Sequence, residues 1–218
     1  MTSTRDGHAS RRIADGLRQA ILTGDLGPGA RIRQEDLAAR FSASRVPVRD
    51  ALRILEAERL VTLVANSGAW VSHFNLAECE EIYQVRERVE PLLLRASTPV
   101  AAETIDRMAE LATLMESDED VDALLAHDRE FHWLPYAAAR TVVLADIVEQ
   151  VWNTTHRYRR AFAVNMDAQA RTVMNDEHHM LVRALRAGDT EHAEQVLKGH
   201  IRRTRVQLKK CPEIFEQL

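Results

Sequence analysis

The stretch from Arg33 to Phe74 constrains the fold of this 218-residue chain more than any other, because it combines two amphipathic patterns with two β-prone runs. Apolar residues at helical spacing lie on both sides of a break, SAS: Leu37, Ala38 and Phe41 before it, and Val48, Leu52 and Leu55 after it. The runs VTLVA and AWVSHF follow, joined by Asn66-Ser67-Gly68, which is typical of a hairpin turn. Two helices, a tight turn and a hairpin predict a winged helix-turn-helix.

The second of these helices carries a stripe of arginines. Arg45, Arg49 and Arg53 recur every four residues beside the apolar stripe, so they face outward when the apolar side packs inward. Ser44 is placed to cap this helix, and Pro47 lies in its first turn, where no hydrogen bond is lost. An outward guanidinium stripe is the layout of a helix that reads DNA. A solvated helix face is the alternative interpretation.

An earlier helix completes the small core. Three apolar residues share one face of a segment that runs from Ser10, its expected cap, to about Thr23: Ile13, Leu17 and Ile21. The run GDLGPGARI that follows is rich in glycine and contains a proline, which indicates a turn. We therefore expect one DNA-binding domain over residues 1–74, with the hairpin as its wing.

Charge is distributed unevenly along the chain. The formal net charge is −4, but residues 1–74 carry 11 Arg and no Lys against 8 acidic residues, an excess of +3. Residues 75–218 carry 18 basic residues against 25 acidic ones, an excess of −7. The basic part is therefore the part with the predicted helix-turn-helix, as expected for a segment that contacts a polyanion.

Cysteine usage and hydropathy indicate the compartment. Cys79 and Cys211 are too few for a disulfide scaffold, which favours a reducing environment. No apolar run approaches the ~20 residues of a membrane span, and the N-terminal MTSTRDGHASRR lacks the apolar segment of a signal peptide. We expect a cytoplasmic protein with no membrane partner.

Several linked motifs over residues 10–74 resemble the GntR family of bacterial transcription regulators: LAARF, SRVPVRDAL, LEAERLV and NSGAWV. The resemblance implies that Arg45 and Arg49 contact bases or phosphates in the major groove of operator DNA, while Gly68 lets the wing approach the minor groove. The forked guanidinium suits guanine and phosphate alike. Glu35 stands where the fatty-acid-responsive branch has an arginine, so no operator sequence is inferred. The expected DNA-binding set is Ser44, Arg45, Arg49, Arg53 and Gly68.

Beyond Phe74 the patterns are helical throughout, which predicts a separate all-α, bundle-like domain over residues 75–218 and a mostly α protein. The expected helices cover about residues 76–96, 104–116, 121–138, 141–164, 168–186 and 189–210. In the first of them, Arg86 flanks the expected apolar face, which consists of Ile82, Val85, Val89, Leu92 and Leu93.

Polar residues occupy positions that the helical rhythm assigns to the interior of this domain. Asp128 and His132 lie four apart on the apolar face of one helix, His178 on that of a second and His200 on that of a third. An unpaired buried aspartate would be very costly, and inward imidazoles need partners as well. One divalent transition metal, such as zinc or nickel, would satisfy all four. For any single histidine, an ordinary hydrogen-bonded core position is the alternative.

Residues 76–212 resemble the FCD ligand-binding domain of the FadR subfamily, through VRERVEP, HDREFHWLPYAAA, NDEHHMLVRALRAGD and AEQVLKGHI. The resemblance implies that a small organic acid, often a carboxylate, binds beside the metal and that Arg86 helps to hold it. A structural ion pair of Arg86 with Glu90 is the alternative. The metal ligands that the resemblance implies are Asp128, His132, His178 and His200.

These features predict a metabolite-responsive transcription regulator, and a repressor because most regulators of this kind repress. It would bind operator DNA as a homodimer, with the effector at the metal site changing its affinity for DNA. A metal-dependent, hydrolase-like enzyme is one alternative, because a metal with an open position can activate water. We do not expect an enzyme, since no second inward carboxylate is clearly placed as a general base. A purely structural metal is the other alternative.

Overall fold

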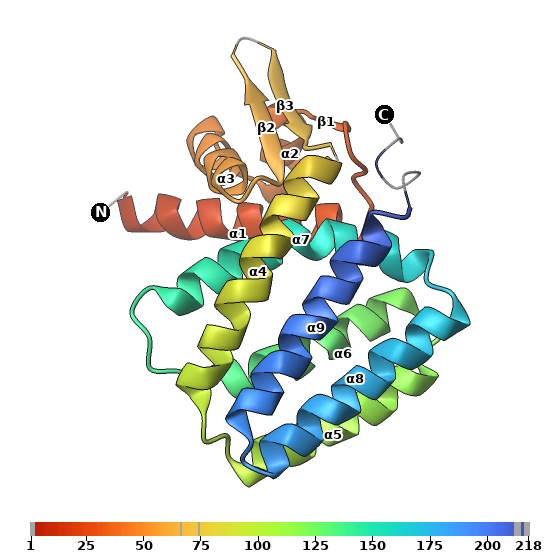
Figure 1. The fold of residues 1–218 in the computed structure, drawn as a ribbon. Coiled ribbons are helices and arrows are strands. Elements are labelled where there is room, and N and C mark those ends of the chain that lie inside the picture. Colours follow the sequence, from red (N-terminus) through yellow and green to blue (C-terminus); the bar gives the residue numbers. More distant parts are fainter. Residues whose placement is uncertain (1–2, 66, 74, 212–214, 216–218) are drawn as a thin grey trace. The chain divides into compact units, whose positions relative to one another are not determined.

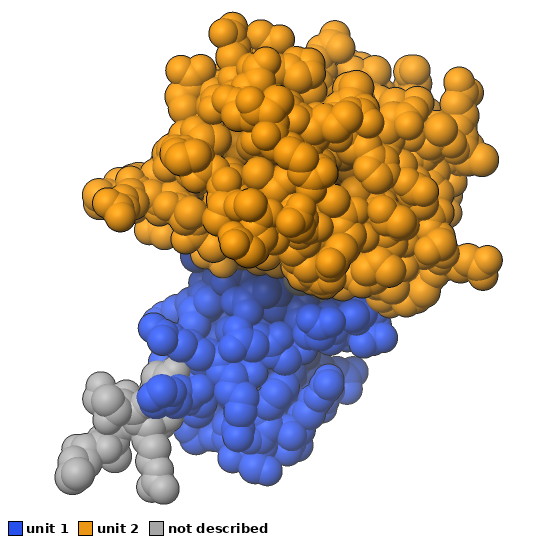
Figure 2. Space-filling model, turned by 90° about the horizontal axis from the view of Figure 1, so that it is seen from below, with its two compact units in different colours: residues 1–75, 215–218 blue, residues 76–214 orange. Residues whose placement is uncertain are grey.

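A computed structural model of the protein describes residues 3–65, 67–73, 75–211 and 215. Contacts within the chain divide it into two compact units, which Figure 2 colours separately: residues 1–75 with 215–218, and residues 76–214. Among the described residues, no helix is both long enough and apolar enough to cross a membrane.

The first unit has the predicted order of elements, with two differences. Helix α1 begins at Ser3, so Ser10 is a buried residue inside it and the prediction that Ser10 caps the helix is wrong. A short strand, β1, was not predicted; it completes an antiparallel sheet of order β1-β3-β2. The elements are α1 (Ser3–Leu22), β1 (Arg31–Ile32), α2 (Gln34–Phe41), α3 (Arg45–Ala57), β2 (Val61–Val64) and β3 (Gly68–Val71).

The inner face of α3 holds this unit together. Val48, Leu52 and Leu55 are at most 1% exposed and belong to an apolar core that includes Ile13 and Leu17 of α1. Their spacing of three and four residues puts them on one side of the helix, as predicted. The opposite side of α3 therefore faces solvent.

The hairpin between β2 and β3 forms the expected wing. Gly68 pairs with Val64 and has a φ of +128°, a conformation that L-residues with a side chain rarely adopt. The backbone N–H of Ser67 donates to the carbonyl of Val64 at 3.0 Å and tightens the turn. Asn66, which was predicted to belong to this turn, lies outside the described residues.

The second unit consists of helices whose bounds match the predicted ones to within a few residues. Three of them are preceded by an aspartate that serves as N-cap, because its carboxylate accepts a hydrogen bond from a backbone N–H of the first turn: Asp120, Asp167 and Asp189. The helices are α4 (Leu76–Ser97), α5 (Ala102–Ser117), α6 (Val121–Tyr136), α7 (Leu144–Val164), α8 (Ala168–Arg186) and α9 (Thr190–Leu208).

These helices surround a common interior (Figure 1). Following the contacts from one neighbour to the next, α4 packs on α9, α9 on α8, α8 on α5, α5 on α6, α6 on α7, and α7 back on α4. Helix α6 also contacts α4 across this ring. Side chains that point inward from helices far apart in the sequence can therefore meet in one place.

The prediction for the inner face of α4 is right for Leu93, which is fully buried, but wrong at two positions. Val85 and Leu92, expected in the core, are 42% and 53% exposed, whereas Arg86, Glu87 and Glu90 are buried. The buried charges are tolerated because they are paired: Arg86 Nε lies 2.5 Å from Glu90 Oε1, and Glu87 Oε1 lies 2.6 Å from Nε of an arginine on α9. Pairing within α4 and between α4 and α9 thus keeps inward the charged side chains that apolar periodicity alone predicts to face outward.

Candidate metal centre and nucleic-acid surface

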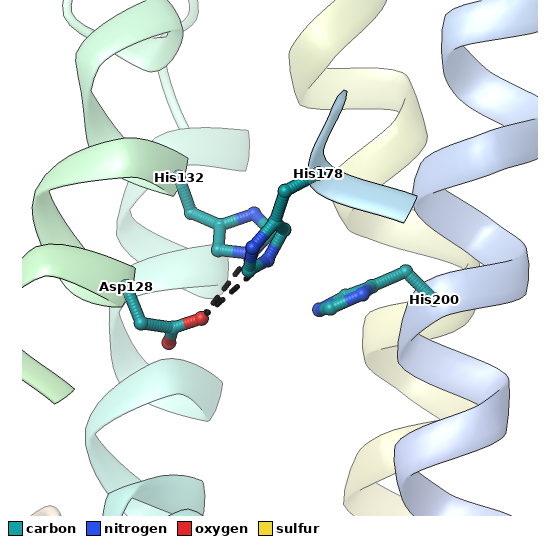
Figure 3. Close-up of side chains that lie close together, drawn as sticks. All are labelled: Asp128, His132, His178 and His200. Carbon is teal, nitrogen blue, oxygen red and sulfur yellow. Dashed lines mark ion pairs between the residues drawn. The ribbon is translucent and has the colours of Figure 1, made fainter. Parts of the chain in front are cut away.

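Four side chains from three helices meet inside the second unit (Figure 3). Helix α6 supplies Asp128 and His132, α8 supplies His178, and α9 supplies His200. One ligand atom from each lies within 4.8 Å of the other three. Ligands bound at ~2.1 Å to one cation lie roughly 3–4 Å apart. One carboxylate and three imidazoles at this spacing could therefore hold a divalent transition metal after a small contraction.

The imidazoles of His132 and His178 have unsatisfied nitrogens. Their Nε2 atoms lie 3.6 Å and 3.8 Å from Oδ1 of Asp128, which is too long for a hydrogen bond (Figure 3, dashed lines). Neither nitrogen of either ring has a hydrogen-bond partner among the described residues. Buried polar atoms normally have partners. A cation between the rings and the carboxylate would supply a partner for the Nε2 atom of each ring.

Burial keeps these two rings neutral. His132 is 3% exposed and His178 is 1% exposed. Burial, and after it the charge of neighbouring His200, lowers the pKa of both well below the ordinary value of 6.5. A metal binds the neutral ring, because it needs the nitrogen lone pair. At neutral pH both histidines are therefore in the form that can bind a metal.

His200 is oriented by Glu177, which sequence reasoning missed. Nδ1 of His200 lies 2.8 Å from Oε2 of Glu177, and Arg203 holds the same carboxylate through Nε at 2.7 Å. Burial by itself would raise the pKa of Glu177, but the hydrogen bonds from His200 and Arg203 outweigh it and lower that pKa to about 2. An ionised carboxylate can only accept, so Nδ1 carries the proton and Nε2 is left to bind a metal.

Of the two alternatives predicted for Arg86, the structure contains the ion pair, and the role in holding an effector stays a prediction. Its ion pair with Glu90 is present, and its Nη1 donates to Thr155 Oγ1 at 3.1 Å. Its guanidinium carbon also lies 4.7 Å from the ring centre of Trp152. Arg86 nevertheless lines the same cavity as the metal-site residues. It is both part of the pocket wall and committed to a buried acid.

Arg159 on α7 also belongs to this site and was not predicted. Its Nη1 lies 3.5 Å from Oδ2 of Asp128, and its guanidinium carbon lies 3.6 Å from the ring centre of Trp152. Burial lowers the pKa of Arg159 to about 10, which still leaves it charged at neutral pH. Its spacing of seven residues from Trp152 puts both on one helix face, which was the available signal.

A cavity of about 40 Å³ lies beside the cluster. At ~10–15 Å³ for each water-sized group, it has room for about three such groups. Charged and apolar side chains share its wall, so it suits a short anionic molecule better than a long one. Its lining includes Tyr83, Arg86, Leu124, Leu125, Asp128, His132, Trp152, Arg159, Phe162, Met174 and His200.

The predicted DNA-facing residues lie on the first unit. Arg45, Arg49 and Arg53 are exposed on the outer side of α3, in contrast to its buried apolar face. Ser44 is the N-cap residue of α3 and is exposed, but its side chain makes no capping hydrogen bond. Gly68 and Arg45 line one groove, whose other residues include Arg31, Arg33 and Glu35.

Arg31 is a basic residue of this groove that sequence reasoning did not identify. It lies on β1, next to the wing, and its Nη2 donates to the carbonyl of Ser67 at 3.3 Å. Its guanidinium carbon lies 5.9 Å from the ring centre of Trp70. Arg31 is thus tied to the hairpin and adds positive charge to the groove that Arg45 of α3 also lines.

Two further histidines near the cluster, His127 and His179, point away from it. His127 pairs with Asp118 at 2.8 Å, and His179 pairs with Glu116 at 2.5 Å. Each is adjacent in sequence to a candidate ligand, and the rotation of 100° per residue in a helix turns it away. The two neighbours therefore provide matched controls for the site.

Comparison with known proteins gives the same division of the chain. The family model described as "Bacterial regulatory proteins, gntR family" matches residues 9–71, and the model described as "FCD domain" matches residues 81–203. A winged helix-turn-helix followed by an all-helical domain defines a class of two-domain transcription regulators. The chain belongs to the GntR family of bacterial transcriptional regulators, and its second domain is an FCD domain.

Individual relatives are similar over most of the chain. The transcriptional repressor GlaR of Escherichia coli is 25% identical over 195 residues, covering 85% of this chain and 89% of that protein. The gluconate operon transcriptional repressor of Bacillus subtilis is 26% identical over 192 residues, covering 82% and 76%. These relatives are regulators, which does not favour the hydrolase-like alternative.

Solved structures show the same fold. The structure of E. coli McbR/YncC superimposes with a TM-score of 0.79 at 21% identity and covers 93% of this chain and 97% of that one. A GntR protein of Rhodococcus sp. RHA1 gives a TM-score of 0.75 at 29% identity, with 92% and 97% covered. The mostly α architecture with a small sheet is thereby confirmed.

Proposed function

We propose that this regulator is a dimeric repressor that binds operator DNA through α3 and the wing, and that a small carboxylate effector binds beside a divalent metal in the FCD domain. Repression is supported by two relatives that are named as repressors. The cluster of Asp128, His132, His178 and His200 carries the metal and effector part, because its two innermost imidazoles have no other partner.

The residues of the site have separate roles in this proposal. The carboxylate and the three imidazoles hold the metal, which when bound supplies a positive Lewis-acid centre for an anionic ligand. Glu177 fixes the tautomer of His200, so that Nε2 faces the centre. Trp152 and the apolar wall exclude water and strengthen charge interactions in the cavity. Effector binding then favours one of two dimer arrangements that differ in their affinity for DNA.

Metal content tests the site directly. The purified full-length protein, dialysed against zinc and then against buffer, should retain about one ion per chain, because four ligands of borderline type converge. His178→Ala should lose it, as measured by elemental analysis. His179→Ala is the matched control, since His179 pairs with Glu116 outside the cluster and should leave metal content unchanged. Equal metal in both variants would count against the site.

DNA binding is tested by fluorescence anisotropy with the segment upstream of the protein's own gene, over a range of salt concentrations. Arg49→Ala should weaken specific binding by ~1–3 kcal/mol, or roughly 5- to 150-fold, because a bidentate contact to a base or phosphate is lost. Arg95→Ala, on the FCD domain, removes a surface charge of the same kind and should have no effect. A wild-type protein that forms no specific complex with this segment, or Arg49→Ala that binds it as tightly as the wild type, would count against the proposed DNA binding.

A further inference from the structure

Among the charged side chains that line the cavity, Arg159 is the one whose charge is least neutralised by its neighbours. The residue is 8% exposed, and its Nε has no hydrogen-bond partner among the described residues. Its acidic neighbour is Asp128, whose Oδ2 lies 3.5 Å from Nη1, at the outer limit of a hydrogen bond. Packing against Trp152 stabilises the cation but does not neutralise it.

Arg86 in the same wall is compensated. Its Nε lies 2.5 Å from Glu90 Oε1, and its Nη1 donates to Thr155. Glu90 is fully buried, so Arg86 cannot turn toward a ligand without leaving that carboxylate unpaired. Of the two cavity arginines, the one that can accept a new anionic partner is Arg159.

Metal binding would increase this imbalance. Asp128 is at once a candidate metal ligand and the acidic neighbour of Arg159, with Oδ1 toward the imidazoles and Oδ2 toward the guanidinium. The other charges around the site cancel in pairs, Arg86 with Glu90 and Arg203 with Glu177. A divalent cation, one aspartate and Arg159 then leave two positive charges uncompensated in a buried site. Such charge requires a counter-ion.

We propose that the metal-loaded pocket selects a compact dicarboxylate, with one carboxylate on the metal side of the cavity and the other paired with Arg159. This inference rests on the proposed metal site and specifies its effector. Two negative charges match the excess, and the guanidinium fork pairs bidentately with a carboxylate. The apolar side chains of Leu124, Phe162 and Met174 line the cavity, where they would contact the short carbon chain that joins the two carboxylates of the ligand. The cavity is too small for longer acids.

Linkage between metal and anion gives a test that does not depend on DNA. The zinc affinity of the full-length protein is measured by competition with a chromophoric chelator, alone and with malonate, succinate, propionate, butyrate or inorganic phosphate at constant ionic strength. Arg159→Gln removes the charge and Arg159→Lys retains it. Arg160→Gln is the matched control, because Arg160 is the next residue of α7 and pairs with Asp122 outside the cavity.

For the wild type, malonate or succinate should tighten zinc binding by about tenfold or more, and the monocarboxylates by no more than a few-fold, since only the dianions balance the charge. Arg159→Gln should bind zinc more tightly than the wild type without an anion, because a repelling charge is gone, and should lose the coupling to dicarboxylates. Arg159→Lys should retain part of the coupling, and Arg160→Gln all of it.

Stoichiometric zinc in the wild type, combined with dicarboxylate coupling that survives in Arg159→Gln, would overturn the role of Arg159. Equal coupling by monocarboxylates and dicarboxylates would overturn the charge rule, and coupling by phosphate but by neither dicarboxylate would overturn the dicarboxylate assignment. If the proposed metal site itself were wrong, the wild type would hold no stoichiometric zinc, with or without any of these anions.

Discussion

The arginines of the two domains are the same side chain in opposite environments. Arg45, Arg49 and Arg53 extend from α3 into solvent, whereas Arg86 and Arg159 are buried against one tryptophan in the FCD domain. An exposed guanidinium is hydrated and screened, so it is available to a phosphate at little cost to the fold. A buried one must be neutralised within the protein or by a ligand. The exposed arginines can therefore meet a partner at little cost to the fold, whereas the charges of the buried ones are tied to the stability of their domain.

The largest expected effect comes from breaking a buried pair. Arg86→Met should lower the free energy of unfolding by ~3–5 kcal/mol, because Glu90 is left buried without its partner. The double variant Arg86→Met/Glu90→Leu should recover most of this loss, since it removes the uncompensated charge as well. Urea unfolding of the metal-free protein measures both. Equal destabilisation of the single and double variants would mean that packing, and not charge, dominates at this position.

A smaller effect should appear in the dependence of stability on pH. Burial, and after it the charges of Arg159 and Arg129, lowers the pKa of His156 from 6.5 to about 3. Between these values the unfolded chain binds the proton and the folded protein does not, so stability is full above pH 6.5 and falls as the pH decreases. The contribution is at most ~1.4 kcal/mol per pH unit.

The variant His156→Gln, which cannot titrate, should show a shallower loss of stability between pH 6.5 and about pH 4 than the wild type. The difference between the two unfolding curves at each pH isolates this residue from the other groups that titrate. His73→Gln in the DNA-binding domain serves as the comparison. Parallel curves for the wild type and His156→Gln would show that His156 does not resist protonation in the folded protein.

The smallest expected effect concerns the exposed arginines of α3 and their acidic neighbour Glu35. Glu35 lies 3.7 Å from Arg45, and their side chains are 84% and 80% exposed. Glu35→Gln should strengthen DNA binding a few-fold, because a negative charge is removed from a surface that approaches phosphates. Stability should not change, since exposed pairs contribute little. Fluorescence anisotropy at low and high salt measures DNA binding, and thermal unfolding measures stability. Weaker binding by Glu35→Gln would contradict the prediction and indicate that Glu35 itself contacts a base.

Prediction from the sequence succeeded where one physical signal dominates. Apolar spacing located α3 and the helices of the FCD domain, and the same spacing assigned Asp128, His132, His178 and His200 to the interior, where they lie together. It failed for part of α4, where Val85 and Leu92 are exposed while Arg86 and Glu90 lie inward and pair with each other. Periodicity counts polar residues as outward, so it cannot detect polar groups that satisfy one another.

Other features depend on neighbours that are distant in sequence. β1 comprises only Arg31 and Ile32, which is too short for an alternating pattern, and it exists because β3 offers a free edge. Glu177 and Arg159 belong to the site through contacts with α9 and α6 respectively. Sequence spacing places each on a helix face but does not say which helix that face will meet.

The order of the four candidate metal ligands along the chain has a consequence for biosynthesis. Asp128 and His132 are made early, but His200 lies on α9, which packs between α4 and α8. A nascent chain emerging from the ribosome therefore lacks one of the four candidate ligands until α9 has formed and docked. A metal at the proposed site would then be captured late, after α9 has packed against α4 and α8.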